Sequence, residues 1–278
     1  NSALARYLSM LLYRTEGKID DARIDKEKIK EAWKLQAHLY NFPKPEIDEY
    51  LKDTAEAKLD LMVFTGRAPD KKANTLYIHT EKDLLIISTS AENPVGKQDL
   101  ETLNIIAWPG IKKGYHFKFQ LPYLEKQDSS VDRVELWIDG EKITKLRTIE
   151  SIENVAIQTF EVKKPLIYLK TIVRTVSKGL LSASAKREMD DSIKNPLLGF
   201  ATRLGTDLAV DATENADLRI SHFFPKLALA GEIHLEPGCY NITIKYIGKN
   251  NTVIYQDTKE EFQIRKNDLN LVESFYLN

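Results

Sequence analysis

The spacing of apolar residues divides the chain into helical and extended stretches. Residues 3–33 carry apolar side chains with helical spacing, and a further short helix is expected over residues 46–58. From Leu59 onward the apolar residues recur at every second position, which is typical of strands. Helical spacing returns between residues 150 and 215, and alternation resumes from residue 217 to the end. This order of elements predicts an α+β protein.

Two short helices at the start of the chain form a candidate hairpin. Gly17 ends the first helix, and Asp20 or Asp21 is expected to cap the second. The pair resembles one tetratricopeptide-type repeat, in which a glycine closes the first helix and an alanine, here Ala22, packs early in the second. A plain helical hairpin packed on the next domain fits the pattern equally well. Either structure leaves an apolar face that needs a neighbour.

The extended stretches predict an antiparallel, sandwich-like domain. Asp139-Gly140 separates two of them and favours a tight hairpin, because both central positions of such a turn need positive φ. The predicted strands are residues 59–64, 75–79, 84–88, 102–108, 115–121, 133–138, 142–147, 218–222, 227–235, 240–246, 252–256, 260–264 and 271–275. We therefore expect a helical, tetratricopeptide-like domain at residues 1–58 and a composite β-rich domain at residues 59–278.

A helical pair over about residues 150–215 is expected as an insertion in the β-rich domain. One helix covers Leu166 to Leu180, and a second follows Pro196. Charged residues interrupt each apolar run well before the ~20 residues that a membrane span needs. Small residues on facing sides favour a tight helical hairpin lying against a sheet. A dimer face or a membrane-surface element is the alternative.

Charge and cysteine content narrow the functional classes. The 278 residues include 40 lysines and arginines against 41 aspartates and glutamates, a formal net charge of -1. This balance argues against a dedicated nucleic-acid-binding protein, which needs a concentrated basic face. The single cysteine, Cys239, excludes an intrachain disulfide and a multi-cysteine zinc site. We expect Cys239 to be a small packing residue.

Motifs that carry catalysis are absent from the sequence. It has no GxSxG elbow, no HExxH pair and no complete phosphate-binding loop. We therefore expect no enzymatic activity, no cofactor and no metal. A hydrolase with a dispersed site would instead require distant side chains to converge in one cleft. Those side chains are His79, His116, His222, His234, Asp190 and Asp191.

Three short segments are candidates for partner contact. Arg67 lies in a stretch that glycine and proline make stiff, Arg219 opens the second β-rich region, and a Pro-Gly turn precedes Tyr240. Ordinary turn chemistry explains all three, and the functional alternative is that Arg67 and Arg219 bind acidic groups of a partner. The candidate residues are Gly66, Arg67, Ala68, Pro69, Asp217, Arg219, Pro237 and Gly238.

The order of these motifs resembles a family of uncharacterised bacterial envelope lipoproteins with an N-terminal tetratricopeptide-like region. The similarity covers roughly residues 1–247 and includes the segments YLSMLLYRTEGKIDDARID, VFTGRAPDK, FQLPYLEK, VELWIDGE and LEPGCYNITI. Where family members commonly carry threonine and an aromatic residue around Arg219, this chain has Leu218 and Ser221-His222. The resemblance implies export, a lipid anchor on a cysteine upstream of Asn1, and no enzymatic activity.

These observations lead to one principal functional hypothesis and one alternative. The first is a non-catalytic structural or interaction protein of the bacterial periplasm or outer membrane. It would dock envelope proteins, or a large assembly, through its helical repeat region. The alternative is an envelope binding module that holds a small apolar ligand, a lipid or a glycan in a groove between the helical pair and the sheet.

Overall fold

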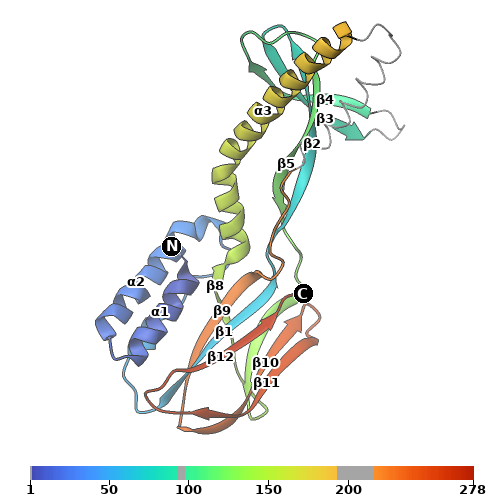
Figure 1. Cartoon of the computed structure of the whole chain (residues 1–278). Helices are drawn as coiled ribbons and strands as arrows, with labels where there is room; N and C mark the ends of the chain where they lie inside the picture. Colours follow the sequence, from blue (N-terminus) through green and yellow to red (C-terminus); the bar gives the residue numbers. More distant parts are fainter. Residues whose placement is uncertain (1, 93–97, 193–215) are drawn as a thin grey trace. The chain divides into compact units, whose positions relative to one another are not determined.

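The computed structural model describes residues 2–92, 98–192 and 216–278. It has a mixed α+β fold with mostly antiparallel sheets, as the sequence predicts (Figure 1). The chain divides into two compact units and passes between them four times. Unit 1 comprises residues 1–70, 126–158 and 221–278, and unit 2 comprises residues 71–125 and 159–220.

Unit 1 contains a β-sandwich covered by two helices. Sheet 1 has the strand order β12-β1-β9-β8, and sheet 2 has the order β11-β10-β6-β7. β12 pairs with β1 in parallel, and the neighbouring pairs are antiparallel. The strands are β1 (Ala57–Arg67), β6 (Val131–Ile138), β7 (Glu141–Lys145), β8 (Arg147–Ser151), β9 (Pro225–Leu235), β10 (Gly238–Gly248), β11 (Val253–Ile264) and β12 (Asn270–Tyr276).

Strand β1 is buried on both of its faces. Because side chains alternate along a strand, Leu59 and Leu61 point into the core between the two sheets, where they join Leu136 and Ile244. Met62 and Phe64 point to the opposite face, where they lie in one hydrophobic core with residues of the two helices. This double burial explains the nearly continuous apolar run that begins at Leu59.

The helices α1 (Ala3–Thr15) and α2 (Ile19–Gln36) form the predicted hairpin, which packs on sheet 1. Figure 1 shows the pair alongside the sheet that contains β1, β9 and β12. Tyr7 of α1 and Ile29 of α2 are fully buried in this shared core. The sequence suggested a boundary near residue 58, whereas here the hairpin and the sandwich belong to one unit.

The cap predicted for α2 is wrong. Lys18 occupies the N-cap position and makes no side-chain cap hydrogen bond, and Asp20 and Asp21 lie in the first turn. There their charges interact favourably with the positive end of the helix dipole. At α1, by contrast, the Ser2 hydroxyl accepts a hydrogen bond from the Ala5 amide at 3.2 Å.

Unit 2 contains one four-stranded sheet and the greater part of a long helix. Sheet 3 has the strand order β4-β3-β2-β5. Ile172 and Val176 of the helix lie in one hydrophobic core with Phe117 and Phe119 of the sheet. The elements are β2 (Asp70–Glu81), β3 (Leu84–Glu92), β4 (Gln98–Ala107), β5 (His116–Glu125) and α3 (Ile152–Ser192).

Four local predictions change in the structure. The helix expected over residues 46–58 is only a 3₁₀ turn, Asp48–Leu51, and residues 218–222 form no strand. The two strands expected within residues 252–264 are one strand, β11. Of the predicted helical pair, α3 is longer than expected and continues through Pro165. The helix expected after Pro196 lies outside the described residues.

The predicted turn at Asp139-Gly140 is confirmed. Both residues have positive φ, 49° and 86° respectively, and they join the antiparallel strands β6 and β7. The Asp139 carboxylate also accepts a hydrogen bond from the Asn241 amide at 2.9 Å. The turn is therefore tied to β10 as well as to its own hairpin.

Candidate functional site

Residues Gly66 to Pro69 connect the two units. The sequence predicted a turn here, but β1 ends at Arg67 and β2 begins at Asp70, in a different sheet and a different unit. The Ala68 amide donates a hydrogen bond to the Phe224 carbonyl oxygen at 2.9 Å. Pro69 is buried, whereas the Arg67 side chain is exposed. The Ala68–Phe224 hydrogen bond holds this segment within unit 1, and Arg67 is its exposed side chain.

Gly66 is required at its position for two reasons. Its φ is +63°, a left-handed conformation that side-chain-bearing residues rarely adopt. A Cβ atom there would also lie 3.0 Å from the Lys226 Cβ and 3.2 Å from the Ser129 Cβ. The structure thus brings together residues from three separate segments of unit 1, which spacing along the chain does not reveal.

Asp217 and Arg219 form an ion pair with each other. The Arg219 Nη2 lies 2.8 Å from the Asp217 Oδ2, and its Nε lies 2.9 Å from Oδ1. The hydrogen bonds from Arg219 lower the pKa of the Asp217 carboxyl well below its usual range. Both side chains are exposed. A partner carboxylate would therefore have to compete with Asp217 for Arg219.

The remaining candidates lie at the turn between β9 and β10. Pro237 is exposed, and Gly238 is the first residue of β10. Cys239 follows it and is exposed, so the prediction that it packs in the interior is wrong. Its position on a strand that alternates inward and outward explains the error, because Tyr240 is the neighbour that packs against the core. The candidates therefore fall on separate loops of the two units.

A buried ionic cluster of Arg14, Asp60 and Glu232 was missed by the sequence analysis. Arg14 of α1 donates from Nη2 to the Asp60 Oδ2 of β1 at 2.5 Å and from Nη1 to the Glu232 carboxylate of β9. Both carboxylate side chains are almost fully buried. The signal was present, since Asp60 is the single charged residue of the predicted strand at residues 59–64. Its partners come from distant parts of the chain.

Two further groups complete this cluster. Arg14 also donates to the Tyr50 carbonyl oxygen at 3.0 Å. The Lys58 Nζ lies 3.8 Å from the Glu232 Oε1 and donates to the same Tyr50 carbonyl oxygen at 2.7 Å. The cluster therefore joins the hairpin, the 3₁₀ turn and sheet 1 at one point. Arg14 and Lys58 face the two carboxylates, and the His234 Nε2 also lies 3.2 Å from the Glu232 Oε1.

A small cavity of about 180 Å³ borders the cluster. Its wall includes Glu232 and Tyr50, together with Arg147, whose guanidinium pairs with the Glu46 carboxylate. This volume is below the roughly 300 Å³ at which small-molecule sites usually begin. The cavity can admit water or a small ion, and it gives no space for a lipid chain.

Burial dominates the electrostatics of the cluster. It raises the pKa of the Asp60 carboxyl to about 7, and the nearby charge of Glu232 adds to the effect while Arg14 opposes it. Burial works against the charge of Arg14, but Asp60 and Glu232 outweigh it and raise the pKa of the guanidinium. Burial lowers the pKa of Lys58. Burial therefore makes the Asp60 carboxyl easier to protonate than that of an exposed aspartate.

Replacing Asp60 with asparagine is expected to change how stability depends on pH. An acid with a raised pKa in the folded state binds a proton on folding, so its contribution to stability is lost as pH rises toward that pKa. The wild type should lose stability relative to Asp60→Asn by up to about 1.4 kcal/mol per pH unit between about pH 4 and pH 7. Urea unfolding at several pH values measures this difference.

Asp20→Asn is the matched control for that experiment. Its carboxylate is almost fully exposed in the first turn of α2, so this substitution removes an acidic group and leaves the buried cluster intact. If the difference between the wild type and Asp60→Asn is flat from about pH 5 to pH 8, Asp60 is charged throughout. That result would contradict the role of burial in the cluster.

The six residues of the dispersed-hydrolase hypothesis are found in different places. His79 and His116 lie together in sheet 3, with ring centroids 5.2 Å apart. His222 and His234 belong to unit 1, where His222 faces Asp70 at 3.5 Å. Asp190 and Asp191 lie on α3 in a stretch whose side chains are outside the described part. Among the described residues, no three His, Cys, Asp or Glu side chains form a group that could hold a metal ion.

Comparisons with known proteins identify no relative of this chain. A scan against protein-family models found no match. Searches of curated proteins and of solved structures likewise found none. The fold therefore defines a structural class only: this is a two-unit α+β protein whose β-sandwich is covered by two helices. The resemblance to envelope lipoproteins stays a prediction.

Proposed function

We propose that the chain is a non-catalytic structural or interaction protein of the bacterial cell envelope, and that it docks partner proteins through its N-terminal hairpin. The observation that carries this proposal is the outer side of the hairpin. While the inner side packs on sheet 1, three large apolar side chains of the hairpin remain exposed to solvent. They are Leu12, Ile24 and Leu35. A contiguous exposed apolar patch marks a partner surface, and we propose that these three side chains contribute to one.

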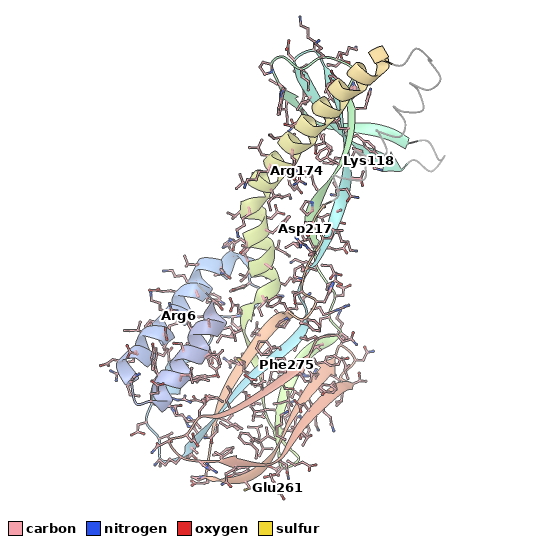
Figure 2. All side chains as sticks on the ribbon, in the orientation of Figure 1. Arg6, Lys118, Arg174, Asp217, Glu261 and Phe275 are labelled. Carbon is pink, nitrogen blue, oxygen red and sulfur yellow. The ribbon has the colours of Figure 1, made fainter. Side chains whose placement is uncertain are left out.

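The hairpin has local features that support its likeness to a tetratricopeptide-type repeat. Gly17 ends α1 with a φ of +73°, a conformation that favours glycine. Ala22 is fully buried near the start of α2, where a small residue allows the helices to approach closely. Arg6, labelled in Figure 2, joins the helices through an ion pair with the buried Asp25 at 2.8 Å. These contacts give partners a preorganised surface.

The envelope assignment rests on the sequence resemblance. That resemblance supports export to the periplasm or outer membrane and a lipid anchor upstream of Asn1. None of the helices in the described part of the chain is long and apolar enough to cross a membrane. The proposal gives the protein neither an enzymatic reaction nor a nucleic-acid partner, in keeping with its balanced charge.

Deleting the hairpin would be a poor test of docking, because it would uncover the apolar face of sheet 1. A sharper test places a photo-crosslinking amino acid at Leu35, whose side chain is 64% exposed on α2. The matched control carries the same group at Val253, which is exposed on β11 of the same unit. Irradiation of living cells that make the protein, followed by mass spectrometry, identifies the neighbours at each position.

The proposal predicts that Leu35 crosslinks a defined set of envelope proteins that Val253 does not. A second substitution, Leu12→Gln, should reduce those crosslinks without altering the fold, because Leu12 is also exposed. Identical neighbours at both positions, or none at Leu35, would contradict docking through the hairpin. Crosslinks only to cytoplasmic proteins would contradict the envelope assignment.

The alternative of a ligand-binding module has no specific observation in its favour. It requires a groove between a helical pair and the sheet, and the second helix of that pair lies outside the described residues. The cavity in unit 1, at about 180 Å³, is too small for an apolar ligand of drug size. Docking of a protein partner therefore has the stronger support.

A further inference from the structure

Helix α3 exposes a row of apolar side chains in unit 2. Their spacing of four, three and four residues places them on one face over three turns of the helix. The neighbouring face of the helix is buried, because Ile172 and Val176 lie in the hydrophobic core with residues of sheet 3. The row, called the α3 stripe, consists of Val162, Leu166, Leu169 and Val173, which are 77%, 56%, 57% and 40% exposed.

Positive charge accompanies the stripe. Lys163 and Lys170 are exposed and seven residues apart, so they lie on the same side of it. Lys164 is different, because it pairs with Glu161 at 3.0 Å. Arg174, labelled in Figure 2, is exposed further along α3. One flank of the stripe is therefore basic, and the other borders the core of unit 2.

Glu161, which pairs with Lys164, is the last acidic residue before a long basic segment. Residues 162–187 include seven lysines and arginines and not one aspartate or glutamate. The chain as a whole is nearly neutral, so this segment is a local concentration of positive charge. An apolar row next to a basic flank is the pattern of a helix that lies in the surface of an anionic membrane.

A second copy of the chain is the less suitable partner for this face. Packing two stripes antiparallel would place the lysine flanks of both copies on the same side of the contact, where like charges oppose it, and a parallel pairing would leave the lysines of both copies without an acidic group to meet. An anionic lipid surface complements both the lysine flank and the apolar side chains of this face. Its headgroups attract the lysines, and its acyl boundary accepts the apolar side chains.

We propose that the α3 stripe and its lysine flank bind the surface of a bilayer that contains anionic lipid. The helix would lie along the membrane with Val162, Leu166, Leu169 and Val173 inserted at the headgroup level. This inference goes beyond docking through the hairpin and does not depend on it, because it concerns another unit and another surface. It also differs from the expected lipid anchor, which would lie upstream of Asn1.

Vesicle flotation with the full chain tests the proposal. One set of vesicles contains one part phosphatidylglycerol to two parts phosphatidylcholine, and the other contains phosphatidylcholine alone. We expect the chain to float with the first set and to remain unbound with the second. Raising the salt concentration should weaken the binding, because it screens the attraction of the lysines.

Two double variants separate the apolar and the charged contributions. Leu166→Gln/Leu169→Gln should lower the partition coefficient at least ten-fold, because it removes apolar groups from the membrane. Lys163→Gln/Lys170→Gln should lower it by about thirty-fold, since each lysine near an anionic surface contributes about five-fold. The matched control is Leu103→Gln, an exposed leucine on β4 of the same unit, which should bind like the wild type.

Several outcomes would overturn the proposal. One is the absence of binding to the phosphatidylglycerol vesicles, and another is equal binding by the wild type and both double variants. Sedimentation velocity provides the third. A wild-type dimer that Leu166→Gln/Leu169→Gln converts to a monomer, without vesicle binding, would show that the stripe is an interface between copies. Circular dichroism of each variant establishes that the fold is retained.

Discussion

Replacing Arg14 with methionine is expected to destabilise unit 1 by about 3–5 kcal/mol, because it leaves the buried Asp60 and Glu232 carboxylates without their principal cation. Methionine keeps much of the length and apolar bulk of arginine, so the loss reports the charge rather than a cavity. The effect should be larger at about pH 8 than at about pH 6, since the uncompensated carboxyls take up protons at the lower pH.

Urea unfolding followed by circular dichroism at both pH values measures this loss. Arg23→Met is the matched control, because Arg23 lies on the same hairpin and pairs with the exposed Asp20 at 3.0 Å. An exposed pair contributes little, so the control should change stability by less than about 1 kcal/mol. Equal effects of the two substitutions would show that the buried cluster does not hold the hairpin to sheet 1.

Replacing Phe119 with alanine is the second change with a large expected effect. Phe119 is almost fully buried in the core of unit 2, with Ile78 and Leu85. Removing a buried phenyl ring costs the transfer free energy of the ring together with the cavity that it leaves, about 3–5 kcal/mol. Because the cores of the units consist of different residues, the damage should be concentrated in unit 2.

Hydrogen exchange detected by mass spectrometry can resolve the two units. In Phe119→Ala, peptides from β2, β3 and β5 should exchange faster, while peptides from β1, β9 and β10 should keep their protection. Phe223→Ala is the control, because Phe223 is exposed. Uniform loss of protection across both units would show instead that they unfold as one cooperative structure.

Periodicity along the chain predicted most local structure but little of its assembly. The strand at Leu59 and the helix from Ala3 follow directly from side-chain spacing, which is a local property. Pairing is not local. The parallel contact of β1 with β12, with Leu59 opposite Asn270, joins distant segments, and no spacing rule specifies it.

The extent of α3 was underestimated for a related reason. Pro165 lacks an amide hydrogen and usually ends or kinks a helix. In the structure it lies on the exposed side of α3, and packing of residues such as Ile172 and Val176 on sheet 3 supports the helix beyond it. Tertiary contacts therefore outweigh the local preference, as they commonly do.

Among the candidate sites, some features depend on the local sequence and others depend on how distant segments assemble. The turn expected at Gly66 to Pro69 is a connection between β1 and β2, and the positive φ of Gly66 is a feature that the structure adds. The Arg14–Asp60–Glu232 cluster needed the fold, since its members come from α1, β1 and β9. The single charge of Asp60 within the predicted strand at residues 59–64 indicates a buried ionic contact. It does not indicate which residues provide the partners.

The pairing of β1 with β12 also sets an order on biosynthesis. During translation β1 emerges well before both of its sheet neighbours, β9 and β12. Until they are made, a strand that is apolar on both faces has unsatisfied edges, a state that favours aggregation. Sheet 1 can therefore close only after β12 has been made, and a newly made chain needs protection of β1 until then.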